Sequence, residues 1–150
     1  MKKLYPILII ILLITCSCNK TPENKKVYKF EIIGKSDTIL FKVNKSGEIF
    51  SKELLIGKFE NNNTLKDNSN FILFNVEDGF LYDYNHNQIG EIDKNGKLEN
   101  KNYTLEWNKK GEFIKDGKKS GIFLKPAHKI LFKPATMLLY SYLEYDVTKN

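Results

Sequence analysis

The residues able to do chemistry are few. Cys16 and Cys18 stand two residues apart, and the two histidines, His86 and His128, lie singly in the loop-like strings "DYNHNQ" and "KPAHK". A nucleophilic triad needs a Ser, Thr or Cys beside a His and a carboxylate. No elbow motif or partnering pattern surrounds either histidine. We therefore expect no catalytic set built on them.

The most metal-like string is "DYNHNQIGEIDK", in which Asp83, Asn85 and Asn87 have the spacing of the first ligands of a calcium loop. The sixth position should be Gly and is Gln88, and the twelfth should be Glu and is Lys94. A hairpin turn, in which Asp and Asn side chains bond their own backbone, is favoured over a calcium site. The sequence predicts no zinc set and no cofactor.

Two carboxylate pairs, Glu77 with Asp78 and Glu91 with Asp93, lie in or beside turns, where solvated side chains are the usual interpretation. Glycosidase-type acid and base chemistry is the less favoured alternative. Four aromatic residues could form a sugar-stacking surface if they were exposed: Tyr82, Tyr84, Tyr103 and Trp107. Their alternation favours a core position for Trp107 and leaves Tyr84 open.

The N-terminus has the pattern of an export signal. Two lysines follow Met1, and residues 4–14 are apolar apart from Tyr5 and Pro6. Such a run is too short for a membrane-spanning helix, which needs about 20 residues. It is typical of a signal peptide.

The residues that follow the apolar run resemble the lipobox of bacterial lipoproteins, in which a small residue precedes a lipidated Cys. Cys18 has Ser17 before it and is favoured; Cys16 has the β-branched Thr15 before it and is the alternative. A Cys16–Cys18 disulfide would close a small, strained ring and is disfavoured. We expect a signal peptide over 1–17, a polar tether over 18–27 and a lipid-anchored protein of the bacterial cell envelope, its leaflet left open.

All 24 basic residues are Lys, and they give a formal charge of +6. Lysines can neutralise phosphates, but here they alternate with 18 acidic residues, and no Arg offers a planar fork for guanine. The densest excess, residues 109–133, is most simply a solubilising face. We expect no nucleic-acid partner.

Six of the nine glycines recur at a fixed spacing of about 32 residues. Gly47, Gly79 and Gly111 form one series, and a second series follows at Gly57, Gly90 and Gly121. Such self-similarity is the signature of a repeat protein, whose units must pack on one another.

Each repeat is expected to hold three strands joined by polar turns such as "NKSG", "VEDG", "NKKG" and "DKNG". Alternation is clearest where Tyr103, Leu105 and Trp107 share one face. No segment over 26–125 has a helical pattern. The sequence predicts one all-β domain over 28–150, a small propeller or barrel-like array.

The glycine-punctuated hairpins "GFLYDYNHNQIGEIDKNGKL" and "GEFIKDGKKSGIF", followed by "PATMLLYSYLEYD", resemble the bacterial β-flower proteins. In that family short hairpin units radiate around a pseudo-symmetry axis, and an Ala, aromatic and Leu run closes the chain. The resemblance covers residues 38–145 and implies a β-flower fold. The family has no established activity, so no functional residue is carried over.

The closing segment, residues 134–145, is compatible with a helix or a strand. As a helix, Pro134 suits the first turn and Leu138, Tyr142 and Tyr145 share a face. As a strand, its bulky alternation is equally suitable. A short helical turn running into a strand is slightly favoured, and covering the end of the array is preferred to binding a partner.

The function predicted from these features is a lipid-anchored, non-catalytic structural or binding module of the envelope. Its partners would be the membrane, through the N-terminal lipid, and an envelope protein or glycan. The alternative is an envelope glycan-acting hydrolase or a hydrolase inhibitor.

Overall fold

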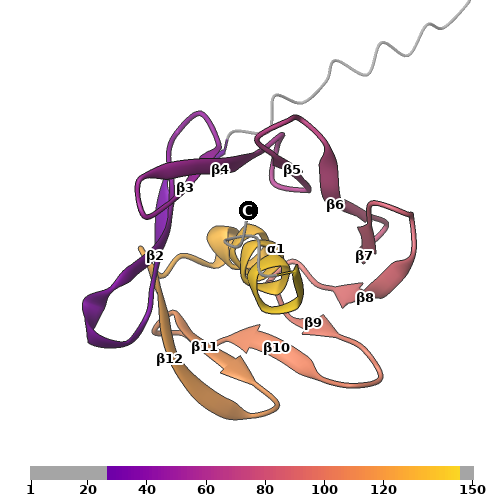
Figure 1. Cartoon of the computed structure of the whole chain (residues 1–150). Helices are drawn as coiled ribbons and strands as arrows, with labels where there is room; N and C mark the ends of the chain where they lie inside the picture. Colours follow the sequence, from indigo (N-terminus) through magenta and orange to yellow (C-terminus); the bar gives the residue numbers. More distant parts are fainter. Residues whose placement is uncertain (1–26, 146–150) are drawn as a thin grey trace, which may run out of the picture.

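The computed structural model describes residues 27–145, which form a closed antiparallel barrel of twelve strands around one helix (Figure 1). The predicted all-β, barrel-like class is confirmed, and of the two structures left open for the closing segment, helix or strand, the helix is observed. The strands are β1 (Phe30–Ile33), β2 (Ile39–Val43), β3 (Glu48–Ser51), β4 (Leu54–Phe59), β5 (Thr64–Asp67), β6 (Ile72–Glu77), β7 (Phe80–Asp83), β8 (Gln88–Ile92), β9 (Leu98–Glu99), β10 (Thr104–Trp107), β11 (Glu112–Lys115) and β12 (Lys118–Lys125). A 3-10 turn, η1 (Lys35–Asp37), follows β1, and the helix is α1 (Lys129–Tyr145).

Each strand pairs with its neighbours in the chain, and β1 pairs with β12 to close the ring. Because successive strands run in opposite directions, the turns alternate between two rims. We call the rim where β1 and α1 begin the amino rim, and the rim where α1 ends the carboxyl rim. Val27 packs beside the Gly47 turn at the amino rim, so the chain enters the barrel there.

The 32-residue period spans four strands, that is, two hairpins, and three periods complete the ring. The expectation of three strands per repeat is therefore wrong by one strand. Strands β5 and β9 were missed because "TLKD" and "LE" each bury a single apolar residue, Leu65 or Leu98. A single buried side chain gives no alternation of apolar and polar residues, and that alternation is what identifies a strand in a sequence.

The first glycine series supplies backbone conformations that other residues rarely adopt. Gly47, Gly79 and Gly111 have φ of +84°, +85° and +76° and lie in turns at the amino rim. The "VEDG" turn is a tight one, since Asp78 also has a positive φ, as hairpins with two-residue loops require.

The second series lies in strands, and there close packing is the reason for glycine. A Cβ on Gly57 would stand 2.2 Å from the carbonyl oxygen of Lys66, and one on Gly90 would stand 2.5 Å from that of Glu99. Gly121 differs, because its φ is +72° and its nearest neighbour is the flexible Lys35 side chain. Four-strand periodicity thus places glycine where neighbouring backbones come close.

Five turns share one geometry, in which an Asn or Asp side chain accepts hydrogen bonds from backbone N–H groups two and four residues ahead. The leading residues are Asn44, Asp67, Asp83, Asp93 and Asn108. The residue three positions later has a positive φ in each turn: Gly47, Asn70, His86, Gly96 and Gly111. The sequence revealed the three that end in Gly, and the hairpin turn predicted at Asp83 is confirmed. Only the turn that ends in Asn70 was missed.

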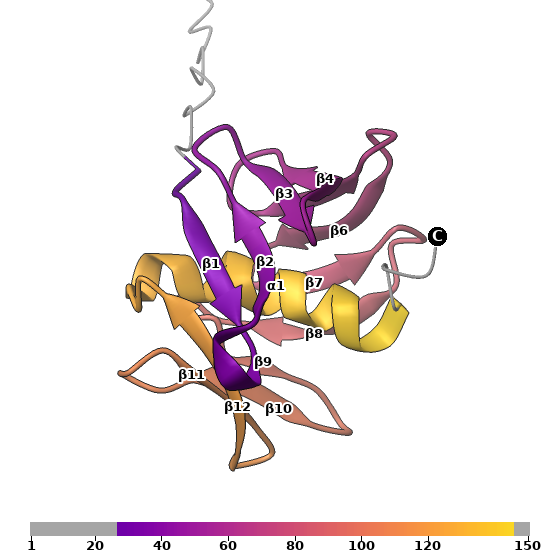
Figure 2. The same cartoon turned by 60° about the vertical axis from the view of Figure 1, so that its left-hand side comes forward.

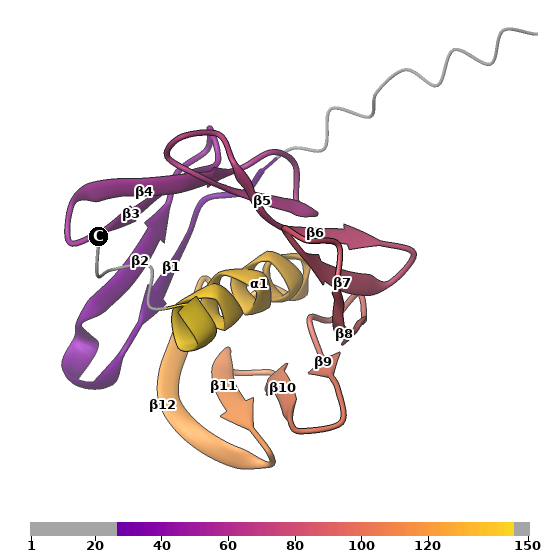
Figure 3. The same cartoon turned by 45° about the vertical axis from the view of Figure 1, so that its right-hand side comes forward.

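The closing segment is a helix throughout, and it fills the barrel instead of capping it (Figures 2 and 3). It begins at Lys129, before Pro134, so the preference for a turn running into a strand is wrong. Its side chains are buried on every side of the helix from Leu131 to Ser141, apart from the half-exposed Lys133. A helix that is apolar all round belongs in a core.

One buried polar group ties the helix to the barrel wall. The hydroxyl of Thr136 accepts a hydrogen bond from Trp107 Nε1 at 2.9 Å and donates to the carbonyl of Gly96 at 2.6 Å. Trp107 is 7% exposed and stacks against Phe132, which confirms its predicted core position. The bond fixes the rotation of α1 within the barrel.

Candidate functional site

The two histidines lie at opposite rims, so the fold does not bring them together. His86 is in the β7–β8 turn at the carboxyl rim, where its ring stacks on Tyr82 with centroids 4.6 Å apart. His128 precedes α1 at the amino rim and lines a hollow of about 440 Å³ with Trp107 and Lys129. Within the described residues, neither imidazole ring forms a hydrogen bond with a carboxylate or hydroxyl.

The calcium-like string forms one of the shared turns. Asp83 Oδ1 accepts from the backbone N–H groups of Asn85 and Asn87 at 2.9 and 2.8 Å, and Asn87 Nδ2 donates to Oδ2 at 3.0 Å. Partial burial opposes ionisation of Asp83, but these hydrogen bonds outweigh it and lower the pKa of the carboxyl. Residues 27–145 contain no group of three or more His, Cys, Asp and Glu side chains suited to hold a metal.

The two carboxylate pairs, Glu77 with Asp78 and Glu91 with Asp93, are exposed or half-exposed and lie in or beside turns. Glu77 accepts a hydrogen bond from Asn75 Nδ2 at 2.6 Å, and Asp93 accepts from the backbone of its own turn. Asp78 and Glu91 are exposed. Each position suits a solvated surface residue.

Exposed apolar side chains gather at the carboxyl rim. Of the ten large hydrophobic residues that are exposed in the described part of the chain, seven lie there: Ile39, Leu54, Leu55, Phe71, Ile72, Tyr84 and Leu143. The chain enters at the other rim. The apolar rim therefore lies at the end of the barrel away from residue 27.

A hollow lies on the outer side of β2 and β3. It measures about 560 Å³, and its lining includes the apolar Ile39 and Phe50 with Lys42 and Lys52 beside them. The barrel lumen offers no comparable space, because α1 occupies it. Any ligand of this size would bind outside the barrel.

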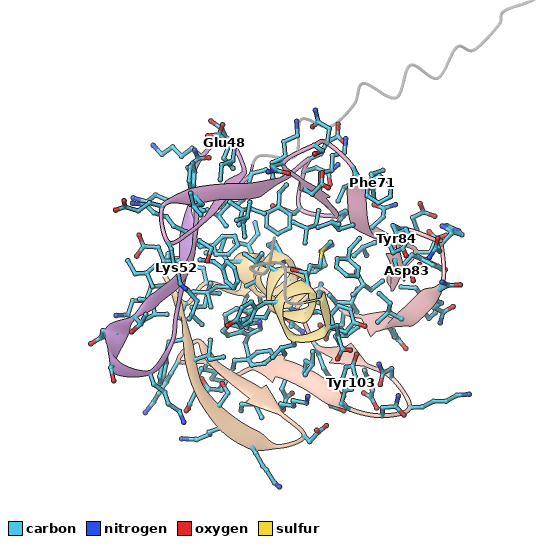
Figure 4. The ribbon with its side chains drawn as sticks, in the orientation of Figure 1. Glu48, Lys52, Phe71, Asp83, Tyr84 and Tyr103 are labelled. Atoms are coloured by element: carbon cyan, nitrogen blue, oxygen red, sulfur yellow. The ribbon has the colours of Figure 1, made fainter. Side chains whose placement is uncertain are left out.

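The clearest exposed aromatic feature is a pair, Phe71 and Tyr84, on the opposite side of the molecule from Lys52 (Figure 4). Their ring centroids are 5.7 Å apart, and the side chains are 53% and 51% exposed. Tyr103 is half-buried and lies beneath the ammonium of Lys115, 5.5 Å from its ring centroid. The open question of Tyr84 is thus resolved in favour of exposure.

The lipidation candidates, Cys18 and the alternative Cys16, lie outside the described residues, as do the expected signal peptide and most of the tether. No helix within residues 27–145 combines the length and apolarity of a membrane span. The chain matches no family model, no curated protein and no solved structure.

Proposed function

We propose that the protein is a lipid-anchored module of the bacterial cell envelope with a binding or structural role and no catalysis. The observation that carries the proposal is the gathering of exposed apolar side chains at the rim away from the chain's entry. Water-exposed apolar patches mark interaction surfaces. A lipid at the opposite end would leave this rim free to meet a partner.

The anchor is tested by metabolic labelling with radioactive palmitate. We expect label on the wild type, none on Cys18→Ser, and label retained on Cys16→Ser. Retention by Cys18→Ser together with loss by Cys16→Ser would move the lipid to Cys16. A wild type that stays unlabelled, while a known lipoprotein in the same cells is labelled, would overturn the anchor.

The binding role is tested by photo-cross-linking in intact cells. A benzophenone amino acid placed at Leu54 or Ile72 of the carboxyl rim should give protein adducts. The same residue at Lys45, in the β2–β3 turn of the amino rim, is the matched control. Equal adduct yields at both rims would remove the rim as an interaction surface.

A glycan ligand is the alternative, and the exposed Phe71–Tyr84 pair is the observation that favours it. Aromatic faces offer apolar area to sugar rings, and the neighbouring turns provide amides such as Asn85. Sedimentation with purified envelope glycan, compared between wild type and a Phe71→Ala Tyr84→Ala double variant, tests this alternative. Loss of co-sedimentation in the variant is the expected result if it is right.

A further inference from the structure

Four lysines stand around the start of α1 at the amino rim, and we call them the lysine cluster. Lys94 lies in the β8–β9 turn, Lys109 and Lys110 lie in the β10–β11 turn, and Lys129 is the first residue of the helix. All four residues are exposed, and within residues 27–145 none of their ammonium groups takes part in an ion pair. The rim therefore carries unpaired positive charge at this point.

Close packing holds the turns of the lysine cluster against the helix. A Cβ on Gly96 would stand 2.6 Å from the carbonyl oxygen of Phe132, and one on Gly111 would stand 2.7 Å from the Cβ of Ala127. The β8–β9 turn therefore rests on the first turn of α1, and the β10–β11 turn rests on the loop that leads into it. The backbone that carries the lysines is thus fixed around the start of the helix.

A hollow of about 440 Å³ lies among these segments, and we call it the amino-rim hollow. Lys109, His128 and Lys129 line it, with Trp107 and Phe132 as its aromatic side. The indole N–H of Trp107 already has a partner in the core, so the rest of the ring lines the hollow. Ammonium and imidazole N–H groups can donate to an oxyanion. The lining therefore suits an anionic oxygen group that stands next to an apolar part.

Two carboxylates of the same turns offset this charge only in part. Asp93 accepts hydrogen bonds from the backbone N–H groups of Asn95 and Lys97 at 2.7 and 2.9 Å. Glu112 lies 3.4 Å from the ammonium of Lys119. Both carboxylates thus have partners that do not line the hollow.

The start of α1 is arranged for an anion and for a lipid surface. The helix begins with Lys129 and has no acidic residue in its first turn, whereas helix N-termini ordinarily favour negative charge. A bound anion would relieve this arrangement. Beside the lysines, Ile130 is 54% exposed and Tyr28, at the chain's entry, is 39% exposed. Exposed apolar and aromatic side chains next to lysines are typical of surfaces that lie against a bilayer interface.

We propose that the amino rim sits on an anionic lipid surface, with a headgroup phosphate in the amino-rim hollow. Charge complementarity and the exposed Ile130 and Tyr28 favour a lipid as the source of the phosphate. The position of the chain's entry favours it too, and in this respect the inference rests on the proposed anchor. The contact would point the apolar carboxyl rim away from the membrane.

The chain enters the barrel close to the lysine cluster. β1 pairs with β12, the strand that leads into His128, and Figure 2 shows α1 beginning on the side of the barrel where β1 begins. Residues 18–26 contain three Lys and one Glu, so they add positive charge at the same rim. Fully extended, they span about 30 Å. A lipid on Cys18 would therefore hold the amino rim within reach of the headgroups.

The test uses the protein purified from cells with its lipid and reconstituted into vesicles that contain a trace of phosphatidylcholine with a nitroxide on its headgroup. Trp107 is the only Trp of the chain, so quenching of its fluorescence reports from the hollow itself. Quenching should be roughly twofold stronger in an equal mixture of phosphatidylcholine and phosphatidylglycerol than in phosphatidylcholine alone. Raising the salt from about 0.02 to about 0.5 M should remove the difference, because exposed charges are then screened.

Charge variants make the test specific to the hollow. One lysine near an anionic surface favours contact roughly fivefold, so Lys109→Gln with Lys129→Gln should lower the ratio of seated to unseated protein about 25-fold and abolish the extra quenching. Lys109→Arg with Lys129→Arg keeps the charge and should keep the quenching. Lys52→Gln with Lys101→Gln is the matched control, because it removes the same charge from turns of the carboxyl rim and should leave the quenching unchanged. Urea midpoints check that each variant folds.

Flotation with vesicles of phosphatidylcholine alone reports the anchor separately. Protein that floats with them, yet shows equal Trp107 quenching in both kinds of vesicle, overturns this inference and leaves the anchor intact. Protein that floats only with the mixture, and is quenched there, supports the lipid contact while the anchor fails. Equal losses of quenching in the Gln pairs of the two rims would overturn the assignment to the hollow. A change in Trp107 emission with inorganic phosphate alone, lost in Lys109→Gln with Lys129→Gln, would assign the hollow to a free phosphate compound and overturn the lipid surface.

Discussion

At the scale of single residues, Asp83 shows how one position can be fitted to a turn instead of a metal. Its carboxylate oxygens accept three hydrogen bonds from its own turn. In the equivalent turns the same position is Asn44 and Asn108, whose amide oxygens accept the same backbone bonds. The position therefore requires an acceptor oxygen and has no need of a charge.

We predict that Asp83→Asn leaves the free energy of unfolding at neutral pH within about 0.5 kcal/mol of wild type, whereas Asp83→Ala loses about 1–3 kcal/mol with its hydrogen bonds. Urea denaturation at pH 7 measures both. Equal losses in the two variants would contradict the role of the acceptor oxygen.

Acid should distinguish Asp83 from Asn. Its pKa is lower in the folded chain than its ordinary value, so the folded state favours the ionised form. That stability is present above about pH 4, the ordinary value for Asp, and is lost as the pH falls through the lowered pKa. Between pH 5 and pH 3, wild type should therefore lose more stability than Asp83→Asn. Parallel urea midpoints of the two proteins across this range would contradict the prediction.

We predict that the Thr136 hydroxyl stabilises the fold, because it links α1 to Trp107 and Gly96 of the barrel wall. Thr136→Val keeps the shape but leaves Trp107 Nε1–H and the Gly96 carbonyl without this partner, which should cost about 1–3 kcal/mol. Thr136→Ser keeps the hydroxyl, removes a methyl group and should cost less. Guanidinium denaturation gives the ranking, and a larger loss for Ser than for Val would show that packing outweighs the hydrogen bond.

Single residues also show where sequence reasoning succeeds. Trp107 was predictable as core because "YTLEW" alternates cleanly, and Leu105 and Trp107 are both buried. The exposure of Tyr84 was undecidable, because the residue ends a strand and enters a turn. The partners of Thr136 lie 29 and 40 residues away in the sequence, and no local pattern can pair them.

At the scale of elements, the helix is the part that the sequence left ambiguous. A buried helix has no polar face, so the 3.6-residue period that identifies a surface helix is absent. The same run of bulky residues also satisfies a strand. Only the lumen of the barrel, which exists once the strands have closed, decides between the two.

We predict that the helix stabilises the fold mainly through its middle turns. Leu139 is fully buried, and Leu139→Ala should cost about 2–5 kcal/mol through lost burial and the cavity left behind. Leu143 is 43% exposed, and Leu143→Ala should cost under about 1 kcal/mol. Comparable urea midpoints for the two variants would mean that α1 is not packed in the lumen in solution.

At the scale of the whole molecule, the repeat period could be predicted from the sequence, whereas the closure of the ring could not. The glycine spacing was readable because Gly57 and Gly90 stand where a Cβ would meet a neighbouring backbone. The number of strands was not readable, since β5 and β9 are short and carry little pattern. Pairing of β1 with β12 joins segments more than 80 residues apart, and no signal in either segment identifies its partner.

Closure has a measurable consequence, because a closed ring has no edge strand. In an open sheet β1 and β12 would be the edges, and their outward amides would exchange with solvent far faster than those of β6 and β7. In the ring, Ile32 lies between Phe41 and Leu124 and is fully buried. We therefore predict that native-state hydrogen exchange, followed by NMR, gives amides of β1 and β12 protection within about tenfold of that in β6 and β7, because both sets open only with the ring. Protection confined to β3 through β10 would show instead that the barrel opens between β1 and β12.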